Sequence, residues 1–185
     1  MLKLLIFIAM LCLSNGLQAA EASSFYQIDL IVFTHEQGTI AKELSLNSTL
    51  ASKNNAIPLQ TEVSKTLSPY HLLPASSSQL REEYWALHRK PQFQVLLNYT
   101  WLQPLNSKSV IALPRIQRNG WVIEGTLGIQ RSNYYLFSSE LLIAAPDNKE
   151  NPFVLRQKLR LKGGDIYYFD HPQAGMLLKV HQLVG

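Results

Sequence analysis

The segment GGDIYYFDHPQAGMLLKVHQLV, residues 163–184, decides most of the fold. Apolar, β-type residues stand on both sides of Asp170-His171-Pro172, where proline restricts the preceding backbone and an aspartate commonly bonds the N–H groups of a turn. The pattern predicts strands over 166–169 and 175–183 with a tight turn between them. Neighbouring side chains on an extended chain point to opposite sides, so Asp170 and His171 do not act as a relay pair unless the turn reorients them. We interpret His171 as a structural turn residue, with a ligand-binding or catalytic role as the alternative.

Outward from this segment, the chain predicts an α+β domain, mainly an antiparallel β-sheet meander with one well-defined amphipathic helix. Residues 25–34 carry apolar groups at both alternating sets of positions, which predicts a central strand covered on both sides. The helix is predicted over 78–90, with Ser77 or Ser78 as its cap, one apolar stripe of Leu80, Tyr84 and Leu87, and Pro91 as its stop. Further strands are predicted over 93–102, 110–113, 120–130, 133–144 and 153–162, with a hairpin turn at 131–132.

The N-terminal part of the chain predicts export. Residues 1–22 combine one positive charge, an apolar run and a small-residue stretch, which is typical of a signal peptide cleaved after Ala20 or Ala22. An uncleaved anchor is the alternative. Residues 23–185 then form a single domain, with a poorly structured connection over 35–78 in which 41–50 are compatible with a short helix.

Composition excludes several classes of function. The only cysteine, Cys12, leaves with the signal peptide, so the mature chain has no disulfide and no thiol nucleophile. A formal net charge of +4 is too weak to indicate nucleic acid as a partner. The five histidines lack metal-ligand spacing, and the chain has no G-x-S-x-G, H-E-x-x-H or phosphate-binding glycine loop. We therefore expect no metal, no cofactor and no enzymatic activity; a hydrolase using Asp170 or His171 is the least favoured alternative.

Two features suit a binding protein. Alternate positions of the strand at 153–162 carry cations, which suits a polymer bearing carboxylates or phosphates, although such a row also serves as a solvated face that discourages edge pairing. The cations are Arg156, Lys158, Arg160 and Lys162. Aromatic residues also accompany the predicted strands, either as exposed platforms or as core. They are Trp101, Trp121, Tyr134, Tyr135, Tyr167 and Tyr168.

Four blocks of the chain resemble the CsiV-type peptidoglycan-binding family of bacterial periplasmic proteins. They are YQIDLIVF at 26–33, VLLNYTWLQP at 95–104, GWVIEGTLGIQRSNYYLF at 120–137 and LRLKGGDIYYFDHPQAGMLLKV at 159–180. The chain departs from the family pattern at Asn98 and Tyr167, where a histidine is usual, and at Leu102, where a basic residue is usual. It retains Trp101, Gln103, Pro104, Asp170, His171, Pro172 and Gly175.

The resemblance implies a non-catalytic periplasmic protein that binds peptidoglycan and supports cell-wall synthesis. It would act on a class A penicillin-binding protein through that enzyme's outer-membrane lipoprotein activator. The alternative is an envelope protein–protein interaction module without direct glycan binding. Taken with the cations and aromatics, the expected ligand-binding residues are Trp101, Gln103, Arg156, Lys158, Arg160, Tyr167, Tyr168, Asp170 and His171.

Overall fold

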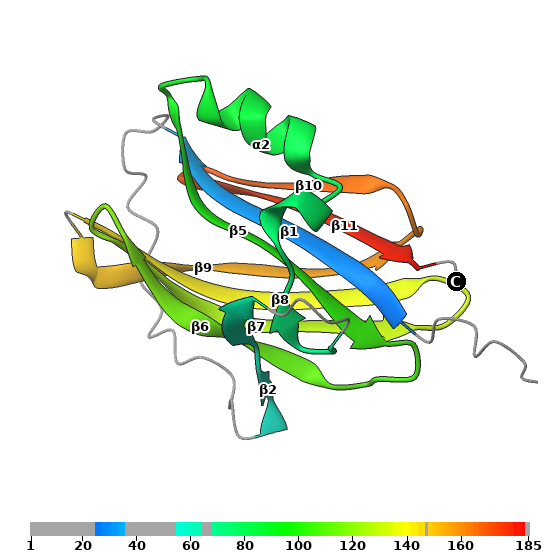
Figure 1. Ribbon diagram of the computed structural model, residues 1–185. Helices are drawn as coiled ribbons and strands as arrows, with labels where there is room; N and C mark the ends of the chain where they lie inside the picture. The colour runs from blue at the N-terminus through cyan, green and yellow to red at the C-terminus, as the bar shows by residue number, and fades with distance from the viewer. Residues whose placement is uncertain (1–24, 36–54, 64–67, 147, 184–185) are drawn as a thin grey trace, which may run out of the picture.

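The computed structural model describes residues 25–35, 55–63, 68–146 and 148–183, which form two β-sheets packed face to face (Figure 1). The first sheet has six strands in the order β10-β11-β1-β5-β4-β3, and the second has five in the order β2-β6-β7-β8-β9. The strands are β1 Phe25–His35, β2 Ile57–Pro58, β3 Gln60–Val63, β4 His71–Leu72, β5 Phe93–Pro104, β6 Val110–Arg118, β7 Trp121–Arg131, β8 Tyr135–Ala145, β9 Asn148–Leu161, β10 Ile166–His171 and β11 Ala174–Gln182. The α+β class, dominated by β-sheet, is confirmed.

Strand β1 is the centre of the six-stranded sheet, as the sequence predicts. It pairs antiparallel with β11 on one side and β5 on the other, and every residue from 26 to 34 is buried. One set of its alternating side chains faces the second sheet, and the other set faces a short helix on the outside. A strand in this position needs apolar residues at both sets of positions, which explains its composition.

The meander was expected to continue through one sheet, and here the structure differs. Strands β6 to β9 form successive antiparallel pairs in the five-stranded sheet, including the predicted β7–β8 hairpin. The chain then crosses after β9, and β10 and β11 join the other sheet beside β1. Alternation along a strand predicts which side chains share a face but carries no information on the strand's partner.

The connection before the helix contributes more structure than the sequence indicates. Its described residues form β2, which pairs parallel with β6, and β3, which pairs parallel with β4. A 3₁₀ turn, η3, follows over Ala75–Ser77. The expected signal peptide and the short helix at 41–50 lie outside the described residues.

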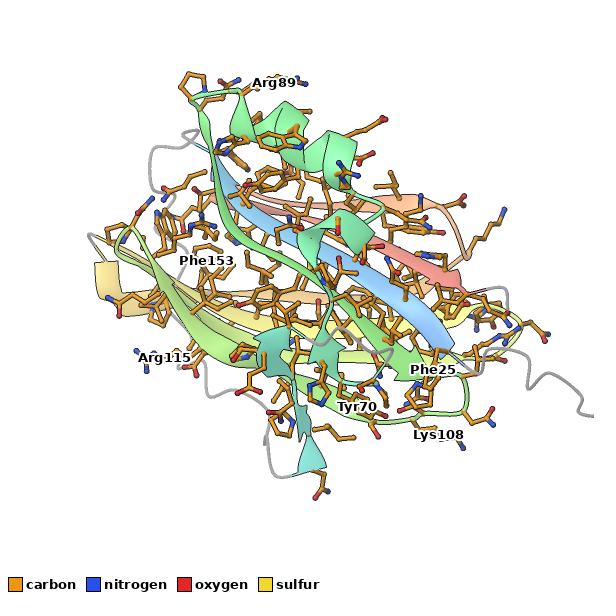
Figure 2. The ribbon with its side chains drawn as sticks, in the orientation of Figure 1. Phe25, Tyr70, Arg89, Lys108, Arg115 and Phe153 are labelled. Atoms are coloured by element: carbon orange, nitrogen blue, oxygen red, sulfur yellow. The ribbon has the colours of Figure 1, made fainter. Side chains whose placement is uncertain are left out.

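Side chains from both sheets fill the space between them, where they form the main core (Figure 2). Among the largest fully buried side chains are Trp101 of β5, Tyr26 of β1 and Phe137 of β8. The Tyr26 hydroxyl donates to the Ile129 carbonyl 2.9 Å away, which ties the two sheets together. Desolvation raises the pKa of Tyr26 well above its ordinary value, so the phenol remains a donor.

A helix covers the outer face of the six-stranded sheet. Helix α2, Arg81–His88, is shorter than the predicted 78–90, although its stripe packs as expected: Leu80, Tyr84 and Leu87 contact Ile31, Phe33 and Val95. Ser78 does not cap the helix itself, because Leu80 is the N-cap residue. The Ser78 hydroxyl instead accepts the Leu80 N–H at 3.1 Å and fixes the turn before the helix. None of the helices among the described residues is long and apolar enough to cross a membrane.

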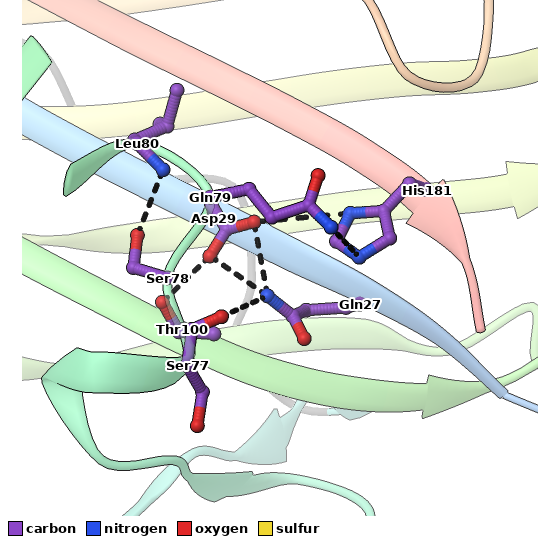
Figure 3. A network of polar contacts seen from close by, with 8 residues as sticks. All are labelled: Gln27, Asp29, Ser77, Ser78, Gln79, Leu80, Thr100 and His181. Atoms are coloured by element: carbon purple, nitrogen blue, oxygen red, sulfur yellow. Dashed lines mark hydrogen bonds and ion pairs between the residues drawn. The ribbon is translucent and has the colours of Figure 1, made fainter. Parts of the chain in front are cut away.

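A buried polar network attaches the chain before α2 to the six-stranded sheet (Figure 3). Asp29 has no exposed surface and accepts the Thr100 hydroxyl at 2.7 Å and the Gln27 amide at 3.1 Å. The Gln27 amide also donates to the Ser77 carbonyl, 2.8 Å away, in η3. The chain before α2 is therefore held by hydrogen bonds in a place where an unpaired polar group would be costly.

Candidate functional site

The nine expected ligand-binding residues do not share one surface. Trp101 and Gln103 point into the core, because in the sheet register they lie opposite Ile28 and Tyr26, which face the second sheet. Trp101 is 0 % exposed and Gln103 is 1 % exposed. The expectation that both line a surface site is corrected: their strand phase faces them inward, where a polymer on the outside does not reach them.

The expected site residues of β10 also point to two different sides of their sheet. Tyr167 and His171 of β10 point toward the five-stranded sheet, while Tyr168 and Asp170 point outward. The His171 ring stacks on Phe153 of β9 at a centroid distance of 4.4 Å, and its Nδ1 accepts the Gln173 N–H at 3.3 Å. The structural interpretation of His171 agrees with these contacts, and Asp170 and His171 do not form a relay pair.

Tyr167 and Tyr168 have different surroundings. The Tyr167 hydroxyl accepts the Lys162 N–H at 2.7 Å and braces the crossing between the sheets. Tyr168 is 55 % exposed, stacks on Phe33 and donates to Asp170 at 2.6 Å. Desolvation, followed by this hydrogen bond, raises the pKa of Tyr168 to about 12, so its hydroxyl stays protonated at neutral pH.

The basic row lies on the opposite side of the molecule, on the outer face of the five-stranded sheet. In the register with β8, Arg156 lies opposite Glu140, Lys158 opposite Ser138 and Arg160 opposite Leu136. All three cations are exposed. The single composite site that combines this row with the turn is therefore not formed.

The two arginines of the row are each engaged by a neighbour. Arg156 donates to Glu140 Oε1 at 2.6 Å, and the Arg160 guanidinium lies 4.7 Å from the centre of the Tyr134 ring. Lys158, between them, has no ion-pair partner among the described residues. The stretch from Arg156 to Arg160 therefore presents an ammonium without an ion-pair partner between two oriented guanidinium groups, and the exposed Lys162 follows directly after β9.

A shallow hollow of about 370 Å³, here called the outer trough, runs across the sheet beside this row. Small side chains make its floor, because Thr126 and Gly128 of β7 lie next to Ser138 of β8. Its walls include Arg156 and Lys158 on one side and Asn55, Ala56 and Val110 on the other. A Cβ at position 128 would lie 2.7 Å from the Ser138 hydroxyl, so glycine keeps the floor open.

The outer trough offers hydroxyl groups on its floor and cations on one wall. Ammonium and guanidinium groups bind carboxylates by charge-assisted hydrogen bonds, which are stronger than neutral ones. The arrangement suits an extended ligand that carries carboxylates and lies across the strands. The described residues include no group of three histidine, cysteine or acidic side chains able to hold a metal ion.

Sequence reasoning missed three residues. Gly128 and Ser138 make the trough floor, and only the pairing of β7 and β8 with β9 shows that they share a face with the cations. Trp85 of α2 is 50 % exposed and stands among charged residues on the side of the helix away from its apolar stripe. A tryptophan on the polar side of an amphipathic helix was its signal.

Comparison with known proteins gives one match. The family model described as "Peptidoglycan-binding protein, CsiV" covers residues 2–183, nearly the whole chain. Searches of curated proteins and of solved structures find no match. With a β-sandwich that carries an open, cationic outer face and a match of this extent, the chain belongs to the CsiV family of peptidoglycan-binding proteins.

Proposed function

We propose that the protein binds peptidoglycan in the outer trough, with carboxylates of the stem peptides held at Lys158 and the flanking arginines. The observation that carries this proposal is the position of Lys158: an exposed ammonium without an ion-pair partner among the described residues, beside a floor of small residues. Stem peptides carry free carboxylates along an extended chain, and alternate residues of β9 repeat at about 6.5–7 Å. The trough therefore presents regularly spaced cations to a ligand with several carboxylates along its chain.

The wider role follows the family to which the chain belongs. We infer an exported, periplasmic protein whose residues 1–22 are removed and whose residues 23–185 act as one binding domain. It supports cell-wall synthesis through an outer-membrane lipoprotein activator and a class A penicillin-binding protein, without catalysing a reaction and without a cofactor. Support for a non-catalytic role comes from β10, where Asp170 and His171 point to opposite sides.

The first test is co-sedimentation of the purified protein with isolated sacculi at increasing salt. The double variant Lys158→Glu, Arg160→Glu reverses two charges of the row. The matched control, Lys108→Glu with Arg118→Glu, makes the same change in net charge at two exposed positions outside the lining of the trough.

We expect wild-type binding to fall with salt, because exposed charges are screened. The trough variant should bind at least about fivefold more weakly than the control at low salt. Equal binding by the trough variant and the control would show that the outer trough is not the peptidoglycan-binding surface. Failure of the wild type to pellet at any ionic strength would remove peptidoglycan binding itself.

A further inference from the structure

A second hollow lies on the other side of the sandwich, beside α2. It has a volume of about 540 Å³ and is here called the helix groove. Its lining includes Gln79, Arg81, Glu82, Glu83 and Trp85 from the helix segment, with Ile166 of β10 and Lys179 of β11. The volume is in the range of small-molecule sites, and none of these residues takes part in the outer trough.

Trp85 is held with half of its surface open. Its ring stands edge to face with Tyr84 at 5.2 Å and with His88 at 5.6 Å, and these two rings stack on one another. The three rings therefore fix the indole while leaving 50 % of the residue exposed. A fixed, exposed tryptophan provides a flat apolar platform with an N–H donor at its edge.

The polar groups around Trp85 balance in charge. Arg81 and Lys179 carry two positive charges, and Glu82 and Glu83 carry two negative ones. The outer trough differs, because there the cations outnumber the single carboxylate of Glu140. The helix groove therefore suits a neutral ligand rich in hydrogen-bonding groups, where the trough suits an anion.

One amide of the groove is held in place by the buried network. The Gln79 amide donates to His181 Nε2 at 2.9 Å, so Nε2 accepts and the imidazole proton lies on Nδ1, facing Asp29 Oδ2 at 3.9 Å. Desolvation lowers the pKa of His181, which keeps the ring neutral at pH 7 in spite of the nearby carboxylate. The Gln79 carbonyl oxygen points away from the imidazole (Figure 3), as an acceptor with a fixed direction.

We propose that the helix groove is a saccharide-binding site in which the indole of Trp85 stacks on the apolar face of a pyranose ring. Gln79, Glu82 and Lys179 offer acceptors and a donor to the sugar's hydroxyl and amide groups. The choice of an N-acetylated amino sugar rests on the proposed function, whereas the neutral saccharide class rests on the groove itself. Because the groove and the trough face opposite sides, each binds its part of the wall polymer independently.

The probe is the N-acetylglucosamine trimer, titrated into the purified protein while tryptophan fluorescence is recorded. Of the three tryptophans, Trp101 is buried and Trp121 packs against the core, so a change on binding reports chiefly on Trp85. We expect saturable binding of the trimer below about 10 mM. Trp85→Ala should weaken it at least about tenfold, and Trp85→Phe, which keeps a smaller ring, should weaken it less.

Binding is followed in parallel by the amide NMR signals of β11, which stay observable when the tryptophan is removed. The control Lys108→Met, an exposed position that lines neither hollow, should leave trimer affinity unchanged. Absence of trimer binding to the wild type, or equal affinity in Trp85→Ala, would contradict the proposal that the helix groove binds a saccharide. If the trimer binds and sacculi do not, peptidoglycan binding is contradicted while the saccharide site in the helix groove is supported. If sacculi bind and the trimer does not, only the saccharide site is contradicted.

Discussion

The two outer faces of the sandwich are built from strands of the same alternating type, yet a helix covers the middle of one, leaving a groove at its edge, while the middle of the other is open. Outward side chains on the six-stranded sheet are large and apolar, including Ile31, Phe33 and Val95, and α2 covers them. Outward side chains in the middle of the five-stranded sheet are small or charged, and among the described residues a shallow trough remains there. Side-chain size on the outward positions thus separates a face whose middle is packed under a helix from a face whose middle stays open to a ligand.

The polar residues of the two faces also differ in how deeply they are buried and in how much they stabilise the fold. Asp29 on the covered face is fully buried and satisfied by several donors, so its hydrogen bonds hold the protein together. The Arg156–Glu140 pair on the open face is short, at 2.6 Å, with the glutamate side chain 13 % exposed and the arginine side chain 67 % exposed. Because the arginine end is solvated, the pair adds little to stability and the cation remains available for binding.

The largest effect is expected from removing the buried carboxylate. Asp29→Ala leaves Gln27 and Thr100 without their acceptor inside the covered face, and should lower the free energy of unfolding by about 3 kcal/mol. Urea unfolding at pH 7 measures this change. Ser138→Ala on the open face is the control and should cost less than about 0.5 kcal/mol. A loss below about 1 kcal/mol for Asp29→Ala would mean that the network does not hold the covered face.

A matched pair of glycine substitutions sharpens the comparison. A Cβ at Gly175, on the covered face, would lie 2.4 Å from the Phe33 ring, which Phe93 and Tyr168 hold on both sides. Gly175→Ala should therefore cost about 2 kcal/mol through overpacking. At Gly128 the nearest atom is the hydroxyl of a movable serine, so Gly128→Ala should cost less than about 0.5 kcal/mol while weakening sacculus binding. Similar thermal shifts for the two variants would contradict the contrast between the faces.

The covered face should also carry a pH dependence of stability. His181 has a lowered pKa in the folded state, first through desolvation and then through Lys179, against the opposing effect of Asp29. The unfolded chain therefore binds more protons than the folded chain just below the ordinary histidine value of 6.5, and stability falls as the pH falls through that window. Urea unfolding of wild type and His181→Gln between pH 7.5 and about 5 should show a smaller loss in the variant. Parallel curves would show that His181 is not the titrating group.

The smallest effect on stability is expected at the open face. Arg156→Ala breaks the pair with Glu140 and should change the free energy of unfolding by less than about 0.5 kcal/mol. The same variant should release the protein from sacculi at lower salt than the wild type. A large loss of stability would show that this row serves the fold rather than a ligand.

Local patterns predicted the parts of the fold that depend on one segment. Apolar residues at both phases of β1 indicated a central strand, the stripe through Tyr84 indicated the face that α2 buries, and the alternation of β9 placed Arg156, Lys158 and Arg160 on one side. Each of these depends on spacing within about ten residues, where periodicity is informative.

The site was predicted less well because it depends on pairings between distant segments. Trp101 looks like an exposed aromatic until its register with β1 is known, since alternation gives the phase of a strand but not the direction of the core. Likewise His171 and Lys158 are near in sequence, but the crossing from β9 to β10 places them in different sheets. The burial of Trp101 and the separation of the two faces therefore required the structure.

The most direct test of the central claim is amide chemical-shift mapping with soluble peptidoglycan fragments. We expect shifts on the outer face of β7, β8 and β9, with Gly128, Ser138 and Lys158 among the residues most affected there. Lys158→Glu should abolish the shifts on this face and leave those at the helix groove. Fragments that bind the protein while leaving these three residues unchanged would contradict the claim that the open face is the peptidoglycan-binding surface.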